Sequence, residues 1–253
     1  MISSGNQTKM NLRTRYGLVR GLCLLTIMIN APGIARAGTE AGASLKSKYV
    51  WAGVLMAEGA VVQGSLKYIA DNGLIIGGAF STVDVGGSGN NQVDILAGYS
   101  DSVGELDYET GLVRHSFIGD GPTDNDANVS RAYFSGSLGA AHFVLKSPLK
   151  DASWTSAGDV YASAGMVQAL PAGFRVAARA GGYYFADDAV FDNGTVAITK
   201  TQSFAFRDAT LSIEHAAAGM PLELGLHFTL GGERRDGSDL DDHIWFSLHT
   251  YLP

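Results

Sequence analysis

Charged side chains recur at alternating positions in several stretches of the chain. Side chains with this spacing share one face of a strand and could bind or repel a passing solute. Glu105, Asp107 and Glu109 form one such series, and Arg175 and Arg179 belong to another in which apolar residues fill the alternate positions. Successive side chains of a β-strand point to opposite faces, so each series shares one face. Acids and bases facing each other across a narrow water path would select ions by charge.

Later segments repeat the pattern, with leucines alternating with Glu223, Gly225 and His227. We predict that the polar faces line the lumen of the structure that these strands enclose. The predicted lining consists of Glu105, Asp107, Glu109, Arg175, Arg179, Asp208, Glu214, Glu223, His227, His243 and His249. An alternative stays open, in which the arginines pair with the carboxylates and fill the interior as a plug that nothing passes.

A hydrolytic site is a second kind of chemistry to consider. His115 and Ser116 are neighbours on a strand, so their side chains point apart and cannot form a base–nucleophile pair. Ser247 and His249 share a face, but no carboxylate is identifiable that would orient the histidine. We predict that the chain is not an enzyme, with a lipid-modifying enzyme that uses Ser247 as the catalytic alternative.

Two acidic loops, residues 120–128 and 236–242, are rich in oxygen ligands. Counted from Asp124, Val129 and Ser135 stand where a calcium loop needs a glycine and a glutamate, and the second loop is equally incomplete. We expect solvated external loops, no metal and no cofactor. Weak bridging of lipopolysaccharide by divalent ions is the alternative for these loops.

The elements that must position the polar faces are β-strands, because period-two alternation extends from Ser44 to the end of the chain. The segments are roughly 9–12 residues long, which suits a tilted membrane strand better than a soluble one. We predict twelve strands, at 45–56, 61–70, 73–82, 92–101, 104–117, 129–136, 139–147, 158–169, 173–184, 205–216, 220–231 and 242–252.

The connections between these segments alternate between short and long. Tight turns near 71–73, 101–104, 136–139, 170–173 and 217–220 alternate with longer polar loops near 83–91, 118–128, 147–157, 185–204 and 231–242. Only the first connection on the long side, around Glu58-Gly59, is short. Aromatic residues near the strand ends fit an interfacial girdle. The fold class is therefore all-β, a closed antiparallel transmembrane β-barrel with both termini at the periplasmic end. A soluble periplasmic β-sandwich is the alternative fold.

Residues 1–37 have the pattern of a cleaved signal peptide. They carry five basic residues and no acid, an apolar run from Leu22 to Ile29, and small residues at Ala35 and Ala37. Cys23, the only cysteine, lies in this segment, and we expect a cysteine-free mature domain at 38–253. After cleavage, 13 basic residues would remain against 25 acidic ones, a net charge of −12. Such a surface repels nucleic acid.

An ordered set of strand motifs resembles a known family. Leu45-Lys46-Ser47-Lys48-Tyr49-Val50-Trp51-Ala52-Gly53-Val54 is similar to the first-strand motif of the TorF-like porin family of Gram-negative outer-membrane proteins. The segments at 63–68, 72–78 and 93–99 continue the likeness in order. The family usually has an arginine where this chain has Ala52, and outer-membrane barrels commonly end on an aromatic residue, whereas this chain ends on Pro253. The resemblance implies an outer-membrane barrel with porin activity.

Taken together, these patterns predict a passive porin-like channel of the outer membrane for small polar solutes or ions. The excess of acids favours cations, and the expected partners are outer-membrane lipids and lipopolysaccharide. The alternative in another class is a structural or adhesive barrel that acts through its extracellular loops.

Overall fold

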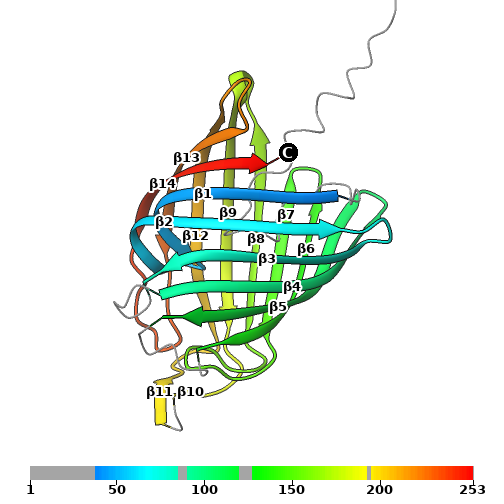
Figure 1. Ribbon diagram of the computed structural model, residues 1–253. Helices are drawn as coiled ribbons and strands as arrows, with labels where there is room; N and C mark the ends of the chain where they lie inside the picture. The colour runs from blue at the N-terminus through cyan, green and yellow to red at the C-terminus, as the bar shows by residue number, and fades with distance from the viewer. Residues whose placement is uncertain (1–37, 85–89, 120–126, 193–194, 253) are drawn as a thin grey trace, which may run out of the picture.

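The computed structural model describes residues 38–84, 90–119, 127–192 and 195–252, so the predicted signal peptide lies outside the described residues. Twelve antiparallel strands close into a barrel in the order β1-β14-β13-β12-β9-β8-β7-β6-β5-β4-β3-β2, and β10 and β11 form a separate two-stranded sheet (Figure 1). The predicted barrel of twelve strands is confirmed. The strands are β1 (Gly38–Trp51), β2 (Val54–Ile69), β3 (Leu74–Val83), β4 (Asn90–Val103), β5 (Leu106–Ile118), β6 (Val129–Leu138), β7 (Ala141–Pro148), β8 (Val160–Ala169), β9 (Phe174–Tyr184), β10 (Ala189–Asp192), β11 (Thr195–Thr199), β12 (Phe204–Ala216), β13 (Leu222–Gly231) and β14 (His243–Leu252).

The two ends of the barrel differ in the length of their connections, as predicted. At one end, the hairpins β2–β3, β4–β5, β6–β7, β8–β9 and β12–β13 are joined by two to five residues. The β2–β3 turn needs Gly73, because its φ is 83° and a Cβ there would lie 2.3 Å from the carbonyl oxygen of Ser100. The long connections, including the one that carries β10 and β11, lie at the other end (Figure 1).

The side chains of the barrel are distributed inside out relative to a soluble protein. Leu66, Ile76 and Ile95 point outward and expose between 57% and 65% of their surface, whereas Lys46 and Arg131 are buried in the interior. An apolar outer wall around a polar interior is the pattern of a barrel surrounded by lipid. Since the sheet closes on itself, the sandwich alternative is wrong.

No helix in the ranges that the structure describes is long and apolar enough to cross a membrane.

The first hairpin turns earlier than predicted. Its turn lies at Ala52-Gly53, with φ values of 46° and 76°, and not at Glu58-Gly59, which is inside β2. Positive φ is uncommon for alanine, so the sequence pattern favoured the glycine that follows an acid. Gly59, with φ 87°, lies at a register shift between β1 and β2. The structure uses it for a β-bulge, which inserts an extra residue and bends the strand.

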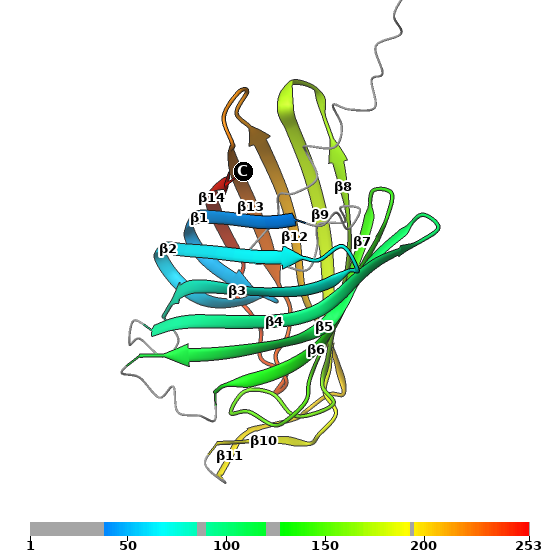
Figure 2. The same ribbon diagram turned by 45° about the vertical axis from the view of Figure 1, so that its right-hand side comes forward.

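The bent end of this hairpin folds into the barrel. Register shifts occur between Lys46 and Lys48 and between Tyr49 and Val50, and both increase the local bend. In Figure 2 the far ends of β1 and β2 curl back toward the barrel interior instead of continuing along the wall. We call residues 48–58 the infolded hairpin. It lies inside the lumen at the long-loop end, where a loop would narrow the passage through the barrel.

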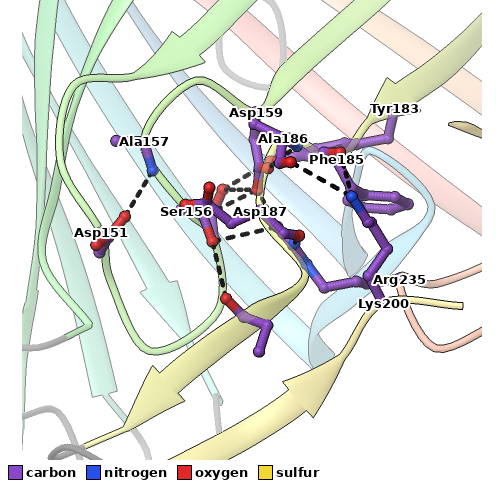
Figure 3. A network of polar contacts seen from close by, with 12 residues as sticks. Asp151, Ser156, Ala157, Asp159, Tyr183, Phe185, Ala186, Asp187, Lys200 and Arg235 are labelled. Atoms are coloured by element: carbon purple, nitrogen blue, oxygen red, sulfur yellow. Dashed lines mark hydrogen bonds and ion pairs between the residues drawn. The ribbon is translucent and has the colours of Figure 1, made fainter. Parts of the chain in front are cut away.

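The three long connections at residues 149–159, 185–203 and 232–242 are tied together around one buried carboxylate (Figure 3). Asp159 is ion-paired with Arg235, and it accepts hydrogen bonds from the backbone nitrogens of Ser156 and Ala186, both at 2.9 Å. Arg235 also donates to the carbonyl oxygen of Asp187 at 2.6 Å. The long-loop end is therefore a connected structure and not a set of independent loops.

This ion pair makes a prediction about the loops. Replacing Arg235 by alanine leaves Asp159 buried without its cation, so local opening of the loops should increase. We expect chymotrypsin to cleave the folded barrel in these loops, at sites such as Trp154 and Phe185, at least about tenfold faster than in the parent. Arg234→Ala, on the exposed side of the same loop, is the control and should leave the rate unchanged. Equal rates in the parent and Arg235→Ala would show that the pair does not hold the loops.

Candidate functional site

The tip of the infolded hairpin, Ala52-Gly53, contacts β12, which lies two strands beyond β14 in the barrel wall. Arg207 in β12 donates from Nε to the carbonyl oxygen of Ala52 at 2.9 Å. A Cβ on Gly53 would lie 2.6 Å from the carbonyl oxygen of Arg207, so the two backbones are in close approach. Ala52 also packs against Tyr161 and Tyr183, which are buried on the inner wall. These contacts explain why an alanine is held at positive φ: the surroundings over-determine its conformation.

Trp51, next to the tip, makes contacts across the lumen. Its ring lies 5.9 Å from that of Trp154 and 6.2 Å from that of Tyr161, measured between centroids. The guanidinium carbon of Arg131 in β6 is 4.5 Å from the ring centroids of both Trp51 and Trp154. Each contact is a cation–π interaction at short range. The hairpin, the wall at β6 and the loop that carries Trp154 therefore meet at one arginine.

Two cavities lie on either side of this meeting point. The larger, of about 100 Å³, is lined by Lys46, Arg179 and His227 among others, and the smaller, of about 60 Å³, by Arg131 and Asp94 among others. Trp51 and Lys146 line both cavities. The infolded hairpin thus contributes to the walls of two small cavities in the lumen. Cavities of this size admit a few waters or a small solute but nothing large.

Cations outnumber acids in the lining of the two cavities. Four of the lining residues are basic, Lys46, Arg131, Lys146 and Arg179, and two are acidic, Asp94 and Glu214. Both acids are already paired, and of the four basic residues Arg179 is paired with Asp208. Asp94 lies 2.8 Å from Nδ1 of His115, and Glu214 is paired with Arg175. Arg131 and Lys146 form no ion pair with any residue that the structure describes. The narrow part of the lumen therefore carries an excess of positive charge.

One cluster of predicted residues comes together toward the short-hairpin end. Arg175 in β9 donates from Nε to Oε2 of Glu214 at 2.6 Å and from Nη2 to Oε1 of Glu223 at 2.9 Å. The three side chains were predicted from separate strands, and the register of β9, β12 and β13 makes them neighbours. This part of the interior resembles the plug alternative, since the charges neutralise one another.

Glu109 belongs to a second cluster on the opposite wall. Lys67 in β2 lies between two carboxylates, with Nζ 3.1 Å from Oε2 of Glu40 and 3.3 Å from Oε2 of Glu109. Tyr133 donates its hydroxyl hydrogen to Oε1 of Glu109 at 2.7 Å. Lys67, Glu40 and Tyr133 were not among the predicted residues. All three occupy inward-facing positions of the alternating pattern. A single polar residue at such a position does not differ in the sequence from any other lumen-facing residue, so the pattern could not single these three out.

Other predicted residues also face the interior. Arg179 is paired with Asp208, and Nδ1 of His227 lies 2.8 Å from Oγ of Ser212. His243 is buried, and His249 lines the larger cavity. Arg179, His227 and His249 thus share one cavity although they come from three strands.

Two predicted residues lie elsewhere. Glu105 is in the β4–β5 turn and exposed to solvent, so it is not part of the lining. The alternation that suggested it begins one residue before β5, where the chain reverses. Asp107, one step further, lies at the short-hairpin mouth and accepts a hydrogen bond from Oγ of Ser102 at 2.5 Å. Neither residue can act on a solute at the constriction.

The residues that form the constriction were missed by sequence reasoning. Lys46, Arg131 and Lys146 lie on the polar faces of predicted strands, so the same alternation could have found them. Trp154 comes from a long loop, and nothing in the pattern of a loop indicates that its ring reaches back over a lumen arginine. The infolding of the hairpin depends on contacts between β1 and β12, which no local signal reports.

The hydrolytic alternative finds no support in the geometry around Ser247. Its Oγ lies 2.8 Å from Nε2 of His227, not His249, and the other nitrogen of His227 is bonded to the neutral hydroxyl of Ser212. The His227 ring is stacked on Trp245 with centroids 3.7 Å apart. A base in a catalytic triad is oriented by a carboxylate, and here a serine has that position.

The two acidic loops carry oxygen ligands of the kind that metal ions use. Within the described ranges, no group of three or more His, Cys, Asp or Glu side chains is arranged to hold a metal ion. Residues 120–126 of the first acidic loop lie outside the described residues. In the second loop, hydrogen bonds from Ser238 hold the pKa of Asp236 below its usual value. The Asp236 carboxylate therefore stabilises the turn of its own loop by accepting these hydrogen bonds.

A comparison with protein families gives one match. Residues 35–181 match the model of a family described as "Bacterial protein of unknown function (Gcw_chp)". No curated protein sequence matches the chain. The TorF-like resemblance is not tested by this match and stays a prediction.

Solved outer-membrane channels share the architecture. The COG4313 outer membrane channel from Pseudomonas putida F1 is 9% identical, with 87% of this chain and 97% of that chain aligned at a TM-score of 0.52. The NanC porin is 9% identical over 85% of this chain and all of its own, with a TM-score of 0.51. The KdgM porin is 8% identical over 85% of this chain and 99% of its own, with a TM-score of 0.50. At such low identity these matches establish the fold alone, a closed β-barrel of the kind found in outer-membrane proteins.

Proposed function

We propose that this chain, which belongs to the bacterial Gcw_chp family of unknown function, is a passive outer-membrane channel for small polar solutes, with a preference for anions. The observation that carries the proposal is the lining of the constriction. Inside a barrel with an apolar outer wall, two small cavities share Trp51 and Lys146 in their linings, and basic residues outnumber acidic ones around them. A ring of cations in a narrow pore attracts anions and repels cations.

The net charge of the chain supported the opposite preference, for cations. That prediction assumed that the acids of the chain face the lumen, but Glu105, Asp187 and Asp188 are exposed at the ends of the barrel. Charges in open solvent are screened over about 8–10 Å, so they affect the constriction less than residues that line it. We therefore favour the local charge over the net charge as the determinant of selectivity.

The alternative of a barrel that acts through its loops draws support from one feature. The buried pair of Asp159 and Arg235 ties three long connections into a connected surface, which a binding role would need. Deleting residues 187–195 separates the two ideas: a channel keeps its conductance, whereas an adhesive barrel inserts but loses its partner. The proposed channel involves no chemical step and no cofactor.

The proposal includes export and membrane insertion. Residues 1–37 would direct secretion and be removed, so that N-terminal sequencing of the protein from outer-membrane fractions should begin at Gly38. The barrel would then contact lipid and lipopolysaccharide through its apolar wall. Recovery in the soluble periplasmic fraction would contradict this part of the proposal.

The test of channel activity is the conductance of residues 38–253 refolded into planar lipid bilayers. We expect discrete, small current steps, because the cavities beside the infolded hairpin have volumes of only about 60 and 100 Å³. A heat-denatured sample of the same protein is the control. A barrel that is folded and inserted but gives no steps would mean that the infolded hairpin closes the lumen.

A further inference from the structure

Arg131 has donors that the protein does not use. Its side chain is 1% exposed, and its Nε and Nη2 atoms have no hydrogen-bond partner among the residues that the structure describes. Leaving donors of a buried charged group unpaired is costly, so proteins rarely retain such an arrangement without a use for it. The contacts of Trp51 and Trp154 with the guanidinium compensate only part of this cost, because they satisfy no N–H group.

The two free nitrogens lie on the same edge of the guanidinium. Nε and Nη2 form a planar fork that matches the two oxygens of a carboxylate. Two tryptophan rings contact the guanidinium, one from the infolded hairpin and one from a long loop, and these rings are perpendicular to each other. A fork whose orientation is fixed in advance loses little entropy when it binds a ligand.

The surroundings of the fork add further donors. Arg131 lines the 60 Å³ cavity together with Lys146 and His115, and with Gln92, whose amide nitrogen already donates to Asp94. Nε2 of His115 is also buried without a partner among the described residues, while its Nδ1 is engaged by Asp94. Lys146 adds a second basic side chain, which forms no ion pair with a described residue although Asp94 belongs to the same lining. An anion in this cavity would therefore meet two cations and one carboxylate, Asp94, which is already bonded to His115 and Gln92.

Much of the remaining cavity lining is apolar, although Asp94 and Tyr133 also belong to it. Leu96, Val113 and Phe117 are buried there, and Met56 of the infolded hairpin is partly buried beside them. A volume of about 60 Å³ excludes large ligands. The chemistry that fits is a carboxylate with a short apolar substituent.

We propose that Arg131, supported by Lys146, forms a binding subsite for small monocarboxylates in the constriction of the channel. The subsite deepens the proposed function, on which its biological role rests, since it names the class of solute that the anion-preferring lumen would pass. In the smaller cavity, the carboxylate of a solute would lose its hydrating water molecules and bind the two nitrogens of the Arg131 fork. The solute would then pass the Trp51 ring.

The test is a titration of the refolded barrel, followed by tryptophan fluorescence and without any measurement of current. Two of the three tryptophans of the chain flank Arg131, so occupancy of the subsite should change the signal. We expect a saturable change with butyrate and none with butyramide, which has nearly the same shape but no charge. Arg131→Lys keeps the charge and loses the fork, so it should weaken butyrate binding at least about tenfold.

The matched control is Arg114→Lys on the neighbouring strand β5, where the arginine donates to Ser130 at 3.4 Å. This exchange should leave the affinity for butyrate unchanged. If Arg131→Lys does not fold, as judged by heat-modifiable migration on a gel, Lys146→Gln replaces it and should weaken binding about fivefold or more.

Three results would overturn the subsite: no saturable signal from the folded parent, equal affinity in the parent and Arg131→Lys, or equal competition by chloride and butyrate. The titration is independent of conductance, so the two proposals can fail separately. Saturable butyrate binding in a barrel that never conducts would support the subsite and contradict the channel. Conductance without such binding would support the channel and contradict the subsite.

Discussion

Replacing Gly53 by valine is expected to raise the single-channel conductance roughly two- to fivefold, because current through a pore is limited by its narrowest section. A Cβ at this position would lie 2.6 Å from the carbonyl oxygen of Arg207 and 3.0 Å from a methyl group of Leu240. The oxygen belongs to the backbone of β12 and cannot move aside. Valine also disfavours the φ of 76° that the turn requires. The tip should therefore leave the wall, and Trp51 should leave the lumen with it.

The control for Gly53→Val is Gly59→Val on the same hairpin. Gly59 has a φ of 87°, so valine is equally strained there, but a Cβ at this position would meet nothing within 4 Å. Strain alone should therefore leave the conductance close to that of the parent. An increase of the same size in both variants would mean that strain in the hairpin, and not its contact with β12, sets the conductance. Unchanged conductance in Gly53→Val would contradict the assignment of the infolded hairpin as the constriction.

Replacing Asp208 by asparagine is expected to lower the free energy of unfolding by about 3 kcal/mol, the low end of the cost of breaking a buried ion pair on one side. Asp208 is fully buried, accepts a hydrogen bond from the hydroxyl of Tyr161 at 3.0 Å and is paired with Arg179. Asparagine fills the same space but leaves the Arg179 guanidinium without its counter-charge. Unfolding by urea in lipid vesicles, followed by tryptophan fluorescence, measures the change.

Two further variants complete this experiment. Asp188→Asn removes a charge that pairs with Lys200 at the surface, with the Asp188 side chain 95% exposed, and should not change the unfolding midpoint measurably. The double variant Asp208→Asn with Arg179→Met removes both charges and should recover part of the lost stability. If the double variant is less stable than Asp208→Asn, the loss comes from packing and not from an uncompensated charge.

Much of the barrel could be predicted from the sequence, because a strand between lipid and a polar lumen must alternate between apolar and polar residues. Leu224 and Leu226 point outward and Glu223 and His227 inward, as the alternation requires. The turn at Ala52-Gly53 could not be predicted in the same way. An alanine at positive φ is held there by Arg207, which is distant in sequence, and a local pattern contains no information about that contact.

The candidate site was predicted less completely, for two physical reasons. First, alternation predicts which face of the sheet a side chain lies on but not its position along the barrel axis. Glu105 in an exposed turn and Arg179 beside the constriction were therefore predicted alike as lining residues. Second, the net charge counts every acid equally, although Asp187 and Asp188 are exposed in a long loop. Arg131 became distinctive only when its two tryptophan neighbours and its unpaired nitrogens were known.

The reversal potential of the refolded chain, residues 38–253, across a planar bilayer with a gradient of potassium chloride tests the central claim most directly. The account holds that the infolded hairpin and the basic residues beside it form an anion-preferring constriction in an open lumen. It predicts a reversal potential of the sign given by chloride permeation, and a smaller magnitude in Gly53→Val, where the constriction is widened. A reversal potential of the opposite sign, given by potassium permeation, would contradict the account and favour the selectivity expected from the net charge.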